Sequence, residues 1–169
     1  MSIQIPESRL IQAAQTDNDA FLDVFIQAYL EEIGQELQAD KMDALNGMQH
    51  SLLAYHFFRT EIGQGGFIQL IQNGYGPYIF LNPFAKALRQ FGLVELSKMV
   101  YKGREVYEAN RSDLEKETTD EDFHAMYEQY EVFDEMEERF FEIEEECTNL
   151  LARYVDEHIE EFGEVRSDL

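Results

Sequence analysis

The feature that most constrains the fold is the stretch of residues 120–146, where apolar and acidic residues both recur with helical spacing. The apolar positions lie three or four apart and predict a buried stripe made of Met126, Tyr130, Phe133, Met136, Phe140, Ile143 and Cys147. The glutamates follow the same spacing and predict a solvent-facing stripe made of Glu128, Glu131, Glu135, Glu138, Glu142 and Glu145. The stretch therefore predicts an amphipathic helix, either continuous or divided near residues 132–134.

The charge of this predicted helix is unfavourable for the helix itself. Like charges three or four positions apart repel by about 0.2–0.5 kcal/mol per pair, and Arg139 is the only Lys or Arg in the stretch. A helix selected for stability alone would alternate Glu with Lys. The acidic stripe therefore indicates a function, and the apolar stripe would hold it rigid.

The whole chain is acidic but has the composition of a folded protein. Its 169 residues include 13 Phe and 9 Tyr, and 44% are hydrophobic, which argues against a disordered acidic tail. The net charge is −22, from 35 acids and 13 bases. Such a charge repels nucleic acids and anionic membranes, and it attracts basic proteins or cations.

The charge is concentrated in the last third of the sequence. Residues 1–112 carry a net charge of −4, whereas residues 113–169 carry −18. We therefore predict one all-α domain over residues 1–169, with a near-neutral helical core in 1–112 and a strongly acidic helical region in 113–169.

The remaining elements are also predicted to be helical, with no alternating strand pattern of useful length. Apolar spacing predicts helices over residues 6–14, 18–37, 47–62, 67–74, 84–92 and 93–110. Asp17 or Asn18, Asn46, and Thr118 or Thr119 have the chemistry of N-terminal caps, and Asn82-Pro83 resembles a helix start. Glycines 63, 65 and 66 predict a break, residues 75–81 a loop or extended segment, and residues 111–118 a polar break.

Catalytic and metal-binding patterns are weak. Glu121 and His124 have the Glu-x-x-His spacing of di-iron bundles, but the second copy that such a site needs is absent from the sequence. His50 and His56 fall on different faces of their helix, and no calcium loop, P-loop or Gly-x-Ser-x-Gly motif occurs. We expect no enzyme, no cofactor and no metal, with a carboxylate and histidine metalloenzyme or an acidic scaffold as alternatives.

The cellular location predicted from the sequence is cytoplasmic. The N-terminal residues lack the basic and apolar regions of a signal peptide, and no apolar run reaches the length of a membrane span. Cys147 is the single cysteine and falls on the apolar stripe, so it predicts a buried thiol rather than a disulfide or a zinc ligand.

The acidic stripe can be compared with DNA by its charge spacing. Six glutamates over residues 128–145 span about 26 Å at about 1.5 Å per residue, or one charge per roughly 5 Å. A DNA duplex carries one charge per roughly 1.7 Å. Further acids or a second subunit would be needed, and the further acids predicted to take part are Glu121, Asp122, Asp134, Asp156, Glu157 and Glu160. The predicted partner is a basic DNA-binding protein rather than nucleic acid or a membrane.

A resemblance adds to this interpretation. The segment GQGGFIQLIQNGYG resembles the Gly-Gly-Phe-x-Gln-x3-Asn-Gly-x-Gly core of a bacterial all-helical family of DNA-mimic proteins, through Gly65, Gly66, Phe67, Gln69, Asn73 and Gly74. The resemblance extends from about residue 20 to residue 162. It implies a homodimer whose acidic surface occupies the DNA-binding face of a helix-turn-helix transcription factor, and it implies no catalysis. The apolar segment 75–84 could lie in the dimer interface or pack inside its own domain.

Overall fold

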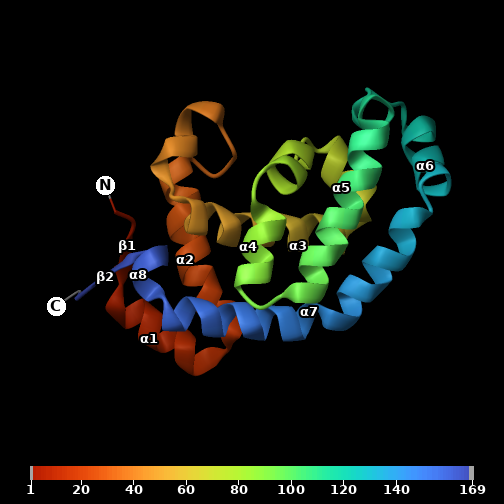
Figure 1. Cartoon of the computed structure of the whole chain (residues 1–169). Coiled ribbons are helices and arrows are strands. Elements are labelled where there is room, and N and C mark those ends of the chain that lie inside the picture. Colours follow the sequence, from red (N-terminus) through yellow and green to blue (C-terminus); the bar gives the residue numbers. More distant parts are fainter. Residues whose placement is uncertain (1, 168–169) are drawn as a thin grey trace. The chain divides into compact units, whose positions relative to one another are not determined.

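The computed structural model describes residues 2–167 (Figure 1). Helices dominate, so the predicted all-α class is confirmed. In chain order the elements are β1 (Gln4–Pro6), α1 (Glu7–Thr16), α2 (Asn18–Ile33), the 3-10 helix η1 (Ala39–Ala44), α3 (Gly47–Gln72), the π-helix η2 (Pro77–Leu81), α4 (Phe84–Gln90), α5 (Val94–Glu115), α6 (Asp120–Gln129), α7 (Val132–Glu157), α8 (Ile159–Phe162) and β2 (Glu164–Arg166).

The chain forms two compact units. Unit 1 contains Met1–Leu53 and Glu146–Leu169, and unit 2 contains Ala54–Glu145. Helices α3 and α7 each contribute residues to both units. These boundaries differ from the change in charge at residue 113, and one domain over residues 1–169 with an acidic region from residue 113 remains a prediction.

Unit 1 is built from both ends of the sequence. Strands β1 and β2 pair in parallel with Gln4 opposite Glu164, a pair too short to leave an alternating pattern in the sequence. Asn46 caps α3 as predicted, because its Oδ1 accepts the Gln49 N–H at 2.8 Å while Gln49 Oε1 accepts the Asn46 N–H at 2.9 Å. The Tyr29 hydroxyl donates to the Phe162 carbonyl at 2.6 Å, which anchors α8 to α2.

Helix α2 begins as predicted but ends earlier. Asp17 accepts the Ala20 N–H at 2.7 Å and caps its start. Its predicted end at residue 37 is wrong, because Gly34 takes the left-handed conformation at φ 83° and the Gln35 N–H closes the helix onto the Leu30 carbonyl at 2.7 Å.

Aromatic rings fill the core of unit 2. Phe67 stacks on Phe133 with ring centroids 4.9 Å apart, and Phe58 meets Phe140 edge to face at 5.1 Å. All four rings are buried. Since Phe133 and Phe140 belong to the apolar stripe of α7, this core fixes the orientation of the unit 2 part of α7.

The predicted glycine break is confirmed at one position only. Gly66 has φ 78° and ψ −167°, whereas Gly63 and Gly65 continue the helix. The segment 75–81 is not a loop or extended, because most of it forms η2 and buries Tyr78, Ile79 and Phe80. This burial favours packing within unit 2.

Two further boundaries in unit 2 differ from the prediction. Asn82 does not cap α4, because its amide donates to the Pro77 and Tyr78 carbonyls and closes η2. Helix α5 continues to Glu115 through the predicted polar break, with non-helical dihedral angles at Asn110. Thr119 then caps α6 by accepting the Asp122 N–H at 3.2 Å, which confirms the second of the two predicted caps.

Candidate functional site

The acidic stretch forms two helices, α6 and α7, joined at Tyr130 and Glu131. Tyr130 has non-helical dihedral angles of −115° and 48°, and its hydroxyl donates to Asp113 at 2.5 Å. Burial and this hydrogen bond raise the pKa of Tyr130 to about 12. The prediction that the glutamates from Glu128 to Glu145 form one stripe on a single helix is therefore wrong. Glu128 lies on α6, and the glutamates of the stripe on α7 begin with Glu135.

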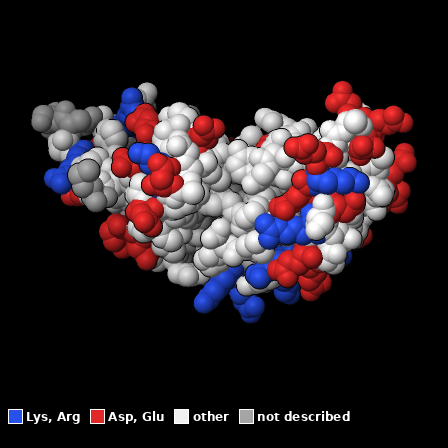
Figure 2. Space-filling view, turned by 90° about the horizontal axis from the view of Figure 1, so that it is seen from above, with Lys and Arg blue, Asp and Glu red and all other residues white. Residues whose placement is uncertain are grey.

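All twelve acids predicted to contact a partner are exposed to solvent. In unit 2 these are Glu121, Asp122 and Glu128 on α6, Glu131 in the junction, and Asp134, Glu135, Glu138, Glu142 and Glu145 on α7. We call these nine residues the acidic surface. Asp156, Glu157 and Glu160 are exposed in unit 1. Figure 2 shows red side chains gathered at the end of unit 2 that carries α6, at the right of the view.

Arg139 neutralises part of the acidic surface. Its guanidinium donates to both carboxylate oxygens of Glu95 on α5, at 2.7 and 2.9 Å, and to Glu142 at 2.7 Å. The hydrogen bond to Arg139 lowers the pKa of Glu95, and the two carboxylates raise the pKa of Arg139. Glu142 is therefore less available to a partner than Glu135 or Glu138, although the sequence pattern made them equivalent.

Glu137 has a different role from the glutamates around it. It lies on the inner side of α7, and its Oε2 accepts the Phe67 N–H at 3.0 Å. It thereby caps the helical segment that restarts after Gly66 in α3. Burial raises the pKa of Glu137, while the Phe67 N–H acts in the opposite direction. This role of Glu137 was not predicted, although its position next to Met136 on the apolar side of the period was a signal.

A second contact holds α6 at the same kink. The Tyr127 hydroxyl donates to the Gly65 carbonyl at 2.7 Å, directly before the non-helical Gly66. The kink in α3 therefore anchors both acidic helices within unit 2, α6 through Tyr127 and α7 through Glu137.

The glycine-rich motif supports this arrangement. Glu61 is buried, with 6% of its surface exposed. Its two oxygens accept the amide hydrogens of Gln69 at 3.0 Å and Asn73 at 2.8 Å. Gly74, at φ 88°, ends the helix as predicted. Gln69 and Asn73 thus satisfy a buried carboxylate, which gives these motif residues a structural role.

Comparison with known proteins agrees with the motif. Residues 43–158 match the family model described as DMP19-like protein. The chain belongs to the DMP19-like family. The DNA mimic protein DMP19 of Neisseria meningitidis serogroup B (strain ATCC BAA-335 / MC58) is 30% identical over 152 residues, which cover 89% of this chain and 92% of the relative. The family resemblance carried by residues 65–74 is confirmed.

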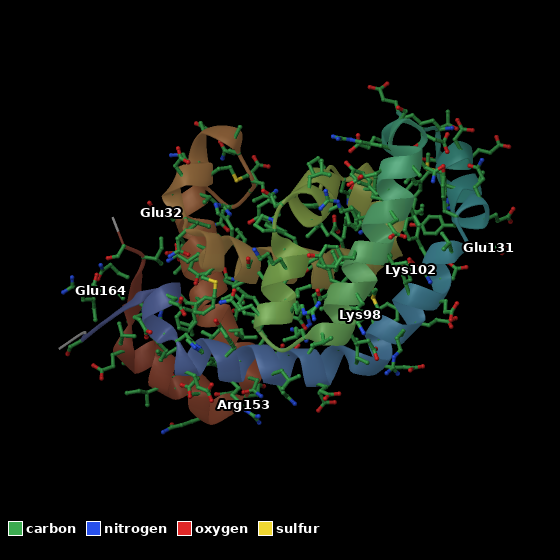
Figure 3. The ribbon with its side chains drawn as sticks, in the orientation of Figure 1. Glu32, Lys98, Lys102, Glu131, Arg153 and Glu164 are labelled. Atoms are coloured by element: carbon green, nitrogen blue, oxygen red, sulfur yellow. The ribbon has the colours of Figure 1, made fainter. Side chains whose placement is uncertain are left out.

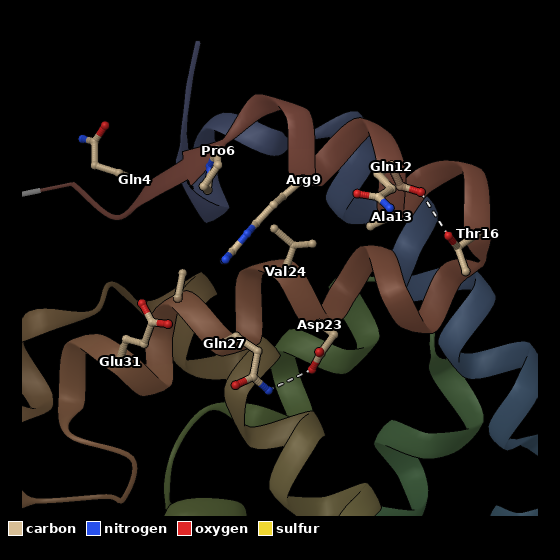
Figure 4. A pocket seen from close by; sticks show the side chains of 11 residues that line it. Gln4, Pro6, Arg9, Gln12, Ala13, Thr16, Asp23, Val24, Gln27 and Glu31 are labelled. Atoms are coloured by element: carbon tan, nitrogen blue, oxygen red, sulfur yellow. Dashed lines mark hydrogen bonds between the residues drawn. The ribbon is translucent and has the colours of Figure 1, made fainter. Parts of the chain in front are cut away.

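The DMP19-like chain also has a groove in unit 1 between β1, α1 and α2 (Figure 4). Its volume is about 400 Å³, and its lining includes Arg9, Val24 and Glu31. Two of its polar side chains already bind each other, because the Gln27 amide donates to Asp23 at 3.0 Å. None of the acids predicted to bind a partner lines this groove.

The metal-binding alternative gains no support from the DMP19-like structure. Glu121 and His124 are both exposed on α6. Among residues 2–167, no three His, Cys, Asp or Glu side chains are grouped so that they could hold a metal ion. Cys147 is buried, as predicted. In the same part of the chain, no helix combines the length and the apolar character that crossing a membrane requires.

Proposed function

We propose that this chain imitates DNA and prevents a basic DNA-binding protein from binding its target. The acidic surface on α6 and α7 occupies the partner's DNA-binding face, and Asp156, Glu157 and Glu160 of unit 1 add further contacts. The partner is a helix-turn-helix transcription factor, and the active form is a cytoplasmic homodimer. The observation that carries the proposal is a row of exposed carboxylates on two helices anchored by buried contacts, with Arg139 the one Lys or Arg between Glu121 and Glu145.

Charge spacing supports a contribution from more than one helix. The α7 acids from Asp134 to Glu145 span about 17 Å at about 1.5 Å per residue, so five carboxylates give one charge per roughly 4 Å. A duplex has one charge per roughly 1.7 Å. The acids of α6, or the same surface on a second subunit, would bring the density closer to that of DNA.

The mechanism is competition by charge and by volume. Lys and Arg side chains that would contact phosphates contact carboxylates instead, and the bound helices exclude the duplex. Long-range attraction makes association fast and dependent on salt. Because a protein surface lacks the condensed counterions of DNA, the affinity falls less steeply with salt than that of DNA.

The test is competition with operator DNA. Each helix-turn-helix repressor of the source organism is purified and bound to its labelled operator DNA. The chain is then added to each complex at low salt. The wild-type chain should release the DNA from one of them, whereas the triple variant E128K/E135K/E138K should need roughly three- to a hundredfold more protein, since three lost charge contacts are together worth about 0.6–3 kcal/mol.

The control is E32K/E36K/E105K, which makes the same change in net charge at exposed acids outside the acidic surface. Competition by this control should stay close to that of the wild type. Equal competition by the two triple variants would remove the acidic surface from the mechanism.

A further inference from the structure

One part of this acidic chain contains no acid. No Asp or Glu occurs in residues 62–94, although the full sequence has 35. Lys86 and Arg89 lie in this segment on α4, and Lys98 and Lys102 follow on α5. All four side chains are exposed. We call these four residues the basic patch.

The basic patch differs from the other cations of unit 2 in its lack of acidic partners. The other cations each form an ion pair within the unit: Arg59 with Glu144, Arg104 with Glu108, Arg111 with Glu115, Lys116 with Asp113, and Arg139 with Glu95 and Glu142. Within residues 2–167, the four side chains of the basic patch make no ion pair. Their charge is therefore available to another molecule.

The helices that carry the basic patch, α4 and α5, pack against each other. The Ser97 hydroxyl donates to the Ala85 carbonyl at 2.6 Å, and Lys98 and Lys86 directly follow these two residues in the sequence. Lys98 and Lys102 are one helical turn apart on α5 (Figure 3).

The basic patch is interleaved with apolar surface. Val94 and Tyr101 on α5 are each 44% exposed, and Tyr101 falls between Lys98 and Lys102 in the sequence. Tyr is enriched in protein interfaces relative to the rest of the surface, so Tyr101 adds a contact that the lysines alone would not supply.

We propose that the basic patch binds a short acidic segment of another polypeptide chain. Four unpaired cations complement several carboxylates, and Tyr101 and Val94 offer apolar contacts to the same segment. A DNA duplex fits less well, because it is a long rod of uniform charge. To reach Lys98 it would approach Glu95 and the neighbouring acids of α7, which repel it.

The basic patch adjoins the acidic surface within unit 2. Glu95 lies one turn before Lys98 on α5 and binds Arg139 of α7. A partner with a basic face and a neighbouring acidic segment could therefore contact both signs of charge at once. The inference goes beyond the proposed function, because an acidic segment can bind here whether or not the acidic surface imitates DNA.

The experiment is an NMR titration of the full-length, isotope-labelled chain at low salt. The probe is a short synthetic peptide of alternating Asp and Glu with blocked ends. Amide signals of the basic patch and of Tyr101 should shift and saturate, while those of α6 should not. The variant K98E/K102E should bind the peptide roughly tenfold more weakly, since two exposed charge contacts become repulsive.

The matched control is K41E/R153E, which changes the net charge equally at two exposed cations of unit 1. Equal weakening by both double variants would show a general charge effect and overturn the proposal. Shifts outside α4 and α5, or tighter binding of a DNA duplex at the same amides, would also overturn it. If K98E/K102E does not fold, K98Q/K102Q takes its place. K98Q/K102Q should bind the peptide with an affinity between those of the wild type and K98E/K102E.

A separate arm distinguishes this proposal from the proposed function. Titration with a basic DNA-binding protein should shift the α6 and α7 amides. If the basic protein causes no shifts in α6 and α7 while the peptide shifts the basic patch, only the DNA-mimic proposal is contradicted. If the basic protein shifts α6 and α7 while the peptide causes no shifts, only the proposal for the basic patch is contradicted.

Discussion

The Phe67 N–H donates to Glu137 Oε2 at 3.0 Å, so a carboxylate of α7 caps the part of α3 that restarts after Gly66. The two residues are 70 positions apart in the sequence. Their contact fixes the acidic helix α7 against the glycine-rich segment of α3. The stability of this contact should therefore control how rigidly unit 2 presents its carboxylates.

Gly66→Ala should destabilise unit 2 by about 2 kcal/mol or more. Its φ of 78° is strained for any side chain, and an added Cβ would lie 2.3 Å from Glu137 Oε2. The control is Gly63→Ala, since a Cβ there meets nothing within 4 Å and the helix should gain up to about 1 kcal/mol. Urea denaturation measures the stability of both variants. Equal unfolding midpoints for Gly66→Ala and Gly63→Ala would contradict the role of the kink.

Replacing Glu137 should have opposite effects with Ala and with Gln. Glu137→Ala removes the cap of Phe67 and should cost about 1–2 kcal/mol. Glu137→Gln keeps an oxygen that can accept the same N–H and removes a half-buried charge. It should be at least as stable as the wild type at neutral pH.

The pH dependence of this pair follows from the raised pKa of Glu137. A raised pKa means that the contribution of Glu137 to stability is greatest below pH 4.5, its ordinary value, and declines as pH rises through the raised value. The glutamine of Glu137→Gln does not titrate. The free energy of unfolding of this variant should therefore rise relative to that of the wild type between about pH 4.5 and pH 7. A difference in the free energy of unfolding that is constant over this range would contradict the burial of the carboxylate.

Tyr130 should make the junction of α6 and α7 sensitive to alkali. Its pKa rises from 10.0 to about 12 through burial and the hydrogen bond to Asp113. Its contribution to stability is therefore complete below pH 10 and is lost between pH 10 and about 12. Tyr130→Phe should cost about 1 kcal/mol at neutral pH, and its deficit relative to the wild type should shrink over that alkaline range. Tyrosinate absorbance and urea denaturation at each pH provide the measurement.

Arg139→Gln should strengthen binding to a basic partner while leaving the fold nearly unchanged. Exposed ion pairs contribute about 0–1 kcal/mol, so the melting temperature should move little. The substitution frees Glu142 and Glu95 and returns the pKa of Glu95 towards its usual value of 4.5. Arg153→Gln is the control, because Arg153 is exposed in unit 1 and lies outside the acidic surface. Weaker binding by Arg139→Gln alone would contradict the proposed function.

Local sequence signals predicted the helix ends well where the capping group lies nearby in the chain. Asp17, Asn46 and Thr119 all cap the helices for which their chemistry suits them. Each of these caps depends on atoms within three residues, so spacing alone identifies it. The exposure of the acids on α7 followed from the same local periodicity.

Features set by distant residues could not be predicted in this way. The apolar period runs through Tyr130 without interruption, so it left a continuous helix and one divided near residues 132–134 both open. The divided alternative is confirmed, and the break lies slightly earlier, at Tyr130, where it coincides with the hydrogen bond to Asp113. Residues 77–81 form a π-helix that buries Tyr78, Ile79 and Phe80 in a core that periodicity does not describe. Glu137 looked like one more glutamate, because its partner is a backbone amide 70 residues away.

The pairing of β1 with β2 has a consequence for how the protein is made. Unit 1 needs Gln4–Pro6 and Glu164–Arg166 together, whereas unit 2 is one uninterrupted segment, Ala54–Glu145. During synthesis on the ribosome, the residues of unit 2 all emerge before the last strand of unit 1 exists. Residues 2–53 must therefore wait for the segment that begins at Glu146, and a chain truncated before Glu164 would expose the edge of β1 that pairs with β2, on which other chains could pair.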